Sequence, residues 1–168
     1  MLYHLAVYDR DKLEAAKRAS VGQLLFKCAR LFNELAIGRV RAVWKVPIRT
    51  AHTSVFPHID LEGTRLTELA RRVGVSKQAV GQLVDELVEM GALERVPDPS
   101  DGRAKLIRFS SRRGRRITDG LAVLMQIETE LARELGRSDT PAPADKMAQL
   151  HDLLLELLPL LETKLEAK

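Results

Sequence analysis

The sequence predicts a mainly α-helical protein with a small β-hairpin wing: a winged helix-turn-helix whose N- and C-terminal helices form a dimerisation region. Three observations predict it. Apolar residues recur at spacings of three and four over long stretches near both ends of the chain. Residues 66–87 show two stretches of helical periodicity separated by a glycine turn. Residues 93–109 contain short strand-like runs on either side of a turn-rich segment. The length of 168 residues fits about one domain.

The first element we expect is one long helix from Leu13 to Trp44, which Pro47 should stop. Its apolar stripe comprises Val21, Leu24, Leu25, Cys28, Leu31, Phe32 and Leu35. A short second helix is expected over residues 48–57, followed by a turn at Glu62-Gly63. We assign residues 1–46 to an N-terminal dimerisation helix and residues 47–110 to a winged helix-turn-helix lobe.

Residues 66–83 predict two short helices joined by a tight turn. The inner face of the first helix comprises Leu66, Leu69, Ala70 and Val73. Gly74 should end this helix with left-handed backbone, and Val75 should be a buried turn residue. Ser76 is a good N-cap for the second helix, expected over about 76–91. The inner face of that second helix comprises Val80, Leu83 and Leu87.

A β-hairpin is expected over about 93–109. Residues 93–96 and 105–109 are short strand-like runs, and residues 97–103 between them are dense in turn residues. This pattern predicts a hairpin with a long, charged tip. A helix-turn-helix followed by such a hairpin is a winged helix.

Residues 111–168 predict a long connecting helix and a C-terminal dimerisation helix. Ser110 or Ser111 should cap the former, which should reach about Gly136, and residues 138–143 are a linker. The last helix, expected over residues 145–164, is crowded with leucine, and Pro159 should kink it or end it early. A helix with so many apolar residues needs another surface to cover its apolar face. We expect the two ends of the chain to form a homodimer interface; the alternative is packing on the first helix of the same chain.

Charge is unevenly distributed. The formal net charge of +4 divides into +4 over residues 1–63, +5 over 64–118 and −5 over 119–168, so the helix-turn-helix region should attract a polyanion. One cysteine excludes an internal disulfide and a four-cysteine zinc site. The sequence has no membrane-length apolar run, secretory signal, enzyme motif or metal-ligand spacing. We therefore expect a cytoplasmic protein that is not an enzyme and has no cofactor.

Residues 95–103 read R-x-x-D-x-x-D-x-R, which resembles the wing motif of the MarR (multiple-antibiotic-resistance regulator) family. Residues 111–114 resemble the T-x-x-G that follows this wing, whereas Ser110 replaces the usual leucine. The resemblance implies a two-fold dimer that binds a pseudo-palindromic operator, usually as a repressor. It also implies, in many members, an effector pocket between the dimer helices and the DNA-binding lobe.

The second helix of the helix-turn-helix should present its N-terminal residues to base edges in the major groove. The candidate DNA-binding residues are Ser76, Lys77, Gln78, Gln82, Arg103, Lys105, Arg108 and Arg112. Arg103 is the candidate for the minor groove, and Lys105 and Arg108 for phosphates. Asp101 resembles the family's wing aspartate, which steadies that arginine. The alternative for these residues is a solvated polar surface.

A basic cluster occupies the first turns of the helix after the wing: Arg112, Arg113, Arg115 and Arg116. Positive charge is unfavourable there because a helix N-terminus is already positive. An external anion such as DNA phosphate would explain the cluster; a solvated basic run is the alternative.

The candidate effector-binding residues are Trp44, Arg49, His52 and Phe56. An aromatic residue with Arg and His would suit a small aromatic or phenolic carboxylate, and ordinary core packing is the alternative. Cys28 lies on the apolar face of the first helix, where a small buried hydrophobe is the simplest interpretation and a thiol-based redox sensor the alternative. A winged helix used only for protein interaction is a further alternative to DNA binding.

Overall fold

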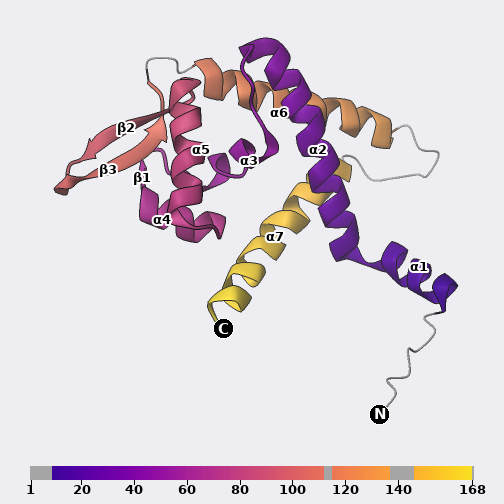
Figure 1. Ribbon diagram of the computed structural model, residues 1–168. Coiled ribbons are helices and arrows are strands. Elements are labelled where there is room, and N and C mark those ends of the chain that lie inside the picture. Colours follow the sequence, from indigo (N-terminus) through magenta and orange to yellow (C-terminus); the bar gives the residue numbers. More distant parts are fainter. Residues whose placement is uncertain (1–8, 112–114, 137–145, 168) are drawn as a thin grey trace. The chain divides into compact units, whose positions relative to one another are not determined.

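The structure is a computed structural model that describes residues 9–111, 115–136 and 146–167 (Figure 1). The chain divides into two compact units, residues 1–114 and 115–168. Within the described ranges, no helix is long and apolar enough to cross a membrane.

The N-terminal region holds two helices, α1 (Arg10–Ala19) and α2 (Val21–Trp44), where the periodicity predicted one. Ser20 separates them with an extended backbone (φ −76°, ψ 114°), and its Oγ accepts a hydrogen bond from the Gln23 N–H at 3.3 Å. The prediction of one helix was wrong because the apolar spacing continues across a serine whose hydroxyl competes for backbone donors.

The predicted second helix is two short pieces, α3 (Thr50–Thr53) and the 3₁₀ helix η1 (Phe56–His58). Val55, which lies between them, is fully buried. Pro57 interrupts regular α-helical hydrogen bonding, because proline has no N–H to donate.

A two-residue strand, β1 (Thr64–Arg65), follows the turn at Gly63. Gly63 has φ +106°, and a Cβ there would lie 2.9 Å from Cβ of Leu106, so the turn requires glycine on both counts. Thr64 pairs with Ile107 and Arg65 with Leu106. Sequence patterning missed this strand because two residues are too few to show alternation.

The helix-turn-helix is confirmed as α4 (Leu66–Val73) and α5 (Lys77–Glu89). Gly74 is left-handed at φ 76°, and its N–H donates to the Ala70 carbonyl at 3.0 Å. Val75 was predicted to be buried but is 42% exposed. Its N–H also bonds to the Ala70 carbonyl, and the helices are packed through Leu69 and Ala70 instead.

The wing is the hairpin of β2 (Leu93–Asp98) and β3 (Asp101–Phe109), and the sheet has the antiparallel order β1-β3-β2. Figure 1 shows the hairpin projecting beside α5. The predicted long tip is wrong: only Pro99 and Ser100 separate the strands. The register shifts between Pro97 and Asp98, and this bulge absorbs residues that the sequence assigned to the loop.

The core of residues 1–114 lies between the helix-turn-helix, α3 and the base of the wing. Its largest fully buried side chains are Ile48, His52, Val55, Leu69, Val80, Val84, Leu87, Leu93 and Ile107. Leu83, expected on the inner face of α5, is only half-buried, and Val84 takes the central place. Each buried aliphatic side chain contributes about 1.5–3 kcal/mol relative to an exposed one, which fixes α5 against the sheet.

The second unit contains α6 (Arg115–Gly136) and α7 (Lys146–Glu166), which pack against each other. The expected capping of α6 by Ser110 or Ser111 depends on residues 112–114, which lie outside the described residues, as does the linker at 138–143. Of the two effects expected of Pro159, a kink or an early end of the helix, the early end was wrong. The helix continues to Glu166, because proline removes one hydrogen bond while the flanking turns keep theirs.

Candidate nucleic-acid interface

The N-terminal half of α5 presents the polar side chains that the sequence assigned to DNA. Lys77, Gln78 and Gln82 are exposed, whereas Val80 and Val84 on the opposite face are fully buried. The buried face holds the helix in place, so the exposed face offers one ammonium group and two amides in a defined orientation. Amide and ammonium groups are suited to hydrogen bonding with base edges in the major groove.

Ser76 is exposed, and its Oγ accepts a hydrogen bond from the Ala79 N–H at 3.1 Å. This bond satisfies one of the free donors at the start of α5. The hydroxyl hydrogen is still available to donate. Ser76 can therefore cap the helix and contact DNA at the same time.

The C-terminal half of α5 is acidic, and two of its carboxylates are held by arginines from different elements. Asp85 accepts from Arg95 of β2 at 2.7 Å. Glu86 bonds to Arg49 at the start of α3 and to His52, and these partners, Arg49 first, lower the pKa of Glu86. The negative charge of this part of α5 is thereby partly neutralised.

The wing carries two exposed basic side chains, Arg103 and Lys105. Asp101 accepts a hydrogen bond from the Arg103 backbone N–H at 3.2 Å. Asp101 thus steadies the backbone beneath the arginine, whereas the resemblance implied support of the arginine itself.

Sequence reasoning missed the ion pair between Arg65 of β1, which is exposed, and Asp98 of β2, which is buried. Arg65 Nε donates to Asp98 Oδ2 at 2.7 Å, and the Ser100 N–H and hydroxyl donate to Asp98 Oδ1 at 2.8 and 2.6 Å. These bonds, Ser100 first and then Arg65, lower the pKa of Asp98 to about 2 although its burial opposes the shift. The run Asp-Pro-Ser predicts an Asx turn at Asp98. The arginine that bonds to Asp98 is 33 residues away along the chain, so the local sequence does not indicate it.

The remaining predicted phosphate contacts differ in their surroundings. Arg108 is half-buried, and its Nε donates to Glu94 Oε1 at 2.8 Å, which lowers the pKa of Glu94. Arg108 is therefore a less available cation than Lys105. The basic cluster at 112, 113, 115 and 116, which includes the candidate Arg112, has side chains that lie outside the described residues.

All four effector candidates lie among the described residues, and three of them are buried or stacked. Trp44 and His52 are buried, and Phe56 stacks on Phe109 of β3 with ring centroids 6.3 Å apart. Arg49 is exposed but bonds to Glu86. Arg49 and His52, which were expected to bind a ligand carboxylate, thus bind a carboxylate of the protein.

Cys28 is exposed on α2, contrary to the expectation of a small buried hydrophobe. Leu24 and Leu31 of the same apolar stripe are exposed as well.

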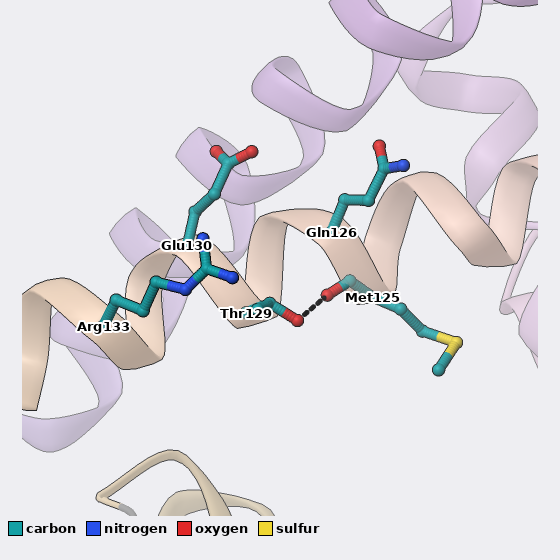
Figure 2. Close-up of a pocket in the computed structure, with 5 residues that line it drawn as sticks. All are labelled: Met125, Gln126, Thr129, Glu130 and Arg133. Carbon is teal, nitrogen blue, oxygen red and sulfur yellow. Dashed lines mark hydrogen bonds between the residues drawn. The ribbon is translucent and has the colours of Figure 1, made fainter.

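A hollow of about 230 Å³ lies on α6 and is lined by Met125, Gln126, Thr129, Glu130 and Arg133. Figure 2 shows Gln126 and Glu130 extending from the same side of the helix and the Thr129 hydroxyl bonded to the Met125 carbonyl (2.8 Å). All its lining residues belong to one helix, and ligand pockets enclose most of a ligand's surface. This hollow therefore does not replace the predicted effector site.

Comparisons with known proteins agree with the fold. Residues 52–104 match the model of the MarR family. The multiple antibiotic resistance protein MarR of Escherichia coli K12 is 31% identical over 93 residues, which make up 55% of this chain and 60% of that protein. The matched segment thus spans less than two thirds of this curated relative.

Two solved structures extend the likeness to most of the chain. CouR from Rhodococcus jostii RHA1, bound to p-coumaroyl-CoA, is 24% identical with a TM-score of 0.59, over 84% of this chain and 90% of that one. A mutant of MarR from Escherichia coli is 24% identical with a TM-score of 0.58, over 83% and 97%. At these identities the structures confirm the winged-helix fold, and the family match confirms the resemblance of the wing motif.

Proposed function

We propose that this chain, which belongs to the MarR family, is a sequence-specific regulator of transcription that binds double-stranded DNA as a homodimer on a pseudo-palindromic operator and represses the adjoining gene. The observation that carries the proposal is the pairing, within one unit, of an exposed Lys77-Gln78-Gln82 face on α5 with an exposed Arg103 on the wing. Both face solvent from a lobe whose buried core holds them in place.

In this proposal α5 enters the major groove. Gln78 and Gln82 can bridge N6 and N7 of adenine, and Lys77 can donate to guanine or to a phosphate. Arg103 enters the adjacent minor groove, whose negative potential is strongest where the groove is narrow. Lys105 and the basic cluster at 112–116 add phosphate contacts.

Exposed apolar side chains support the dimer. They gather on α2, α6 and α7, and within residues 45–111 only Leu61 and Val75 are large, apolar and exposed. Two lobes related by a two-fold axis would bind half-sites about 10–10.5 base pairs apart, centre to centre. The expected place of action is the cytoplasm, where the DNA is.

Response to a small ligand is a further part of the proposal. CouR, which shares the fold, was solved with p-coumaroyl-CoA, and an aromatic or phenolic carboxylate suits the cationic side chains near α3. Such a ligand would compete with Glu86 for Arg49 and His52.

The wing arginine gives the first test. Arg103→Ala should weaken operator binding by about 1–3 kcal/mol, the contribution of one good base contact. The measurement is fluorescence anisotropy with labelled DNA from upstream of the chain's own gene, at fixed salt and with random duplex competitor. Arg18→Ala, which removes an exposed arginine from α1, is the matched control and should bind as the wild type does.

Equal affinity of the Arg103→Ala and Arg18→Ala variants would remove the wing from the mechanism. A wild-type protein with no preference for any fragment of host DNA over the competitor would refute the proposed function itself.

A further inference from the structure

The contact between α3 and α5 has a geometry that packing alone does not require. Both Arg49 Nη2 and His52 Nε2 bond to the same atom, Oε2 of Glu86, and the His52 contact measures 2.8 Å. His52 is fully buried, whereas the Glu86 side chain is 40% exposed. One carboxylate oxygen of α5 is therefore held by two groups of α3, which packs against α5 (Figure 1).

The ring of His52 is oriented by the backbone. Its Nδ1 accepts the Arg49 N–H at 3.0 Å, so the neutral ring carries its proton on Nε2 and donates it to Glu86. A buried ring whose two nitrogens both form hydrogen bonds is fixed in one orientation. Arg49 and His52 therefore form a fixed binding site for the Glu86 carboxylate.

We propose that Arg49 and His52 are positioning residues for DNA binding, which fix the tilt and rotation of α5 through Glu86. The inference rests on the proposed function and assigns to these two residues a role in the protein without ligand, in addition to the proposed effector binding. Within the described residues, the exposed Lys77 at the start of α5 forms no ion pair. The ion pairs that hold α5 lie in its C-terminal half, at Asp85 and Glu86.

The distance along the helix gives the anchor its effect. Lys77 and Glu86 are nine residues apart, about 14 Å at 1.5 Å per residue, so a tilt of about 10° about Glu86 would displace Lys77 by about 2 Å. A hydrogen bond to a base edge tolerates a variation of only about 0.5 Å in length. Loosening the anchor should therefore reduce sequence-specific binding more than non-specific attraction to phosphates.

The test compares three variants of the full-length chain. Glu86→Ala should lower affinity for the operator about threefold to thirtyfold, the usual range for a coupling residue that does not touch the ligand. Its affinity for random duplex should be unchanged or higher, because a negative charge is lost. Glu86→Gln, which keeps an acceptor oxygen for His52, should retain most of the operator affinity.

Glu89→Ala is the matched control, because it removes the same charge from the same helix at an exposed residue. It should not lower operator affinity. If Glu86→Ala and Glu89→Ala change both affinities equally, Glu86 acts only as a charge and the inference is overturned. If Glu86→Gln is as weak as Glu86→Ala, the positioning role is overturned as well.

Hydrogen exchange of the free protein separates this inference from the proposed function. Amides of residues 80–89 should exchange faster in Glu86→Ala than in Glu89→Ala, and equal rates would overturn the coupling of α3 to α5. Failure of the wild type to bind DNA selectively would refute the proposed function, whatever the exchange rates. If Glu86→Ala does not fold, Arg49→Gln, a change at an exposed side chain, replaces it. This variant should speed the exchange of residues 80–89 and lower the affinity for the operator by a larger factor than the affinity for random duplex.

Discussion

The Asp98 carboxylate has donors on two sides, the turn beneath it and Arg65 from β1. Both hold the charged form, which is why its pKa falls although the side chain is only 5% exposed. A buried carboxylate without such partners would shift in the opposite direction. The tip of the wing thus depends on one ionised residue, and Asp101, more exposed and 3.6 Å from Arg65, has a lesser part.

Asp98→Asn should therefore change how stability depends on pH. The pKa of Asp98 falls from its usual 3.8 to about 2 in the folded protein, so its stabilisation is complete above about pH 4 and is lost as pH falls towards 2. The variant should have a lower urea midpoint than the wild type at pH 7, and the difference should shrink between pH 4 and pH 2. Asp101→Asn is the control and should lower the pH 7 midpoint less. If the urea midpoints of Asp98→Asn and the wild type differ by the same amount at all these pH values, the stabilising role assigned to ionised Asp98 is contradicted.

Among the elements, α5 has to satisfy two demands at its N-terminus. Ser76 caps the helix, and the same turn faces the proposed DNA. Ser20 provides a matched case elsewhere, because it caps α2 with the same bond to the backbone three residues on. Comparing substitutions at Ser20 and Ser76 therefore separates the effect of an N-cap on stability from the effect of Ser76 on DNA binding.

Ser76→Ala should cost about 1 kcal/mol of stability, as loss of an N-cap usually does. Ser76→Asp should keep that stability, since aspartate caps as well as serine and favours the helix dipole. Its carboxylate, however, should repel DNA, so operator affinity should fall at least as far as in Ser76→Ala. Thermal unfolding and anisotropy titration measure the two effects. Ser20→Asp should leave binding unchanged; if it weakens binding as much as Ser76→Asp, the interface has been misplaced.

At the scale of the whole molecule, most of the large apolar side chains that are exposed among the described residues lie outside the winged-helix lobe. Leucines along α7 are exposed in the single chain, and α2 exposes a second apolar set that includes Phe26 at 74%. Exposed apolar surface of this extent usually marks an interface. We attribute it to the proposed homodimer, which would place two copies of α5 on one operator.

The pair of changes Leu154→Asp and Leu158→Asp should weaken dimerisation at least tenfold, because each buried leucine contributes about 1.5–3 kcal/mol and about 1.4 kcal/mol is a factor of ten. Sedimentation equilibrium should show the wild type near twice 18.8 kDa and the variant shifted towards the monomer. Leu61→Asp, at an 85% exposed leucine of the lobe, should leave the mass unchanged. A wild-type monomer at micromolar concentration would contradict the assignment of these surfaces.

Local signals were sufficient for much of the lobe. Gly74 and Ser76 specify the turn of the helix-turn-helix within three residues, and the structure has both as predicted. The strand-like runs of the wing are likewise predicted from adjacent residues. The lengths of the two strands and of the loop between them could not be predicted in this way, because the bulge and the short tip depend on how Asp98 bonds to Ser100 and Arg65.

The sequence by itself determined the winged-helix lobe and its exposed basic and amide side chains, since caps, glycine turns and periodicity act over a few residues. Only the tertiary structure decided which charges meet. Arg49 and Glu86 are 37 residues apart, and Arg65 and Asp98 are 33 apart, so neither pair leaves a periodic trace in the chain. Their contacts exist because packing of α3, α5 and the sheet brings distant backbone together, and no local pattern in the sequence indicates that geometry.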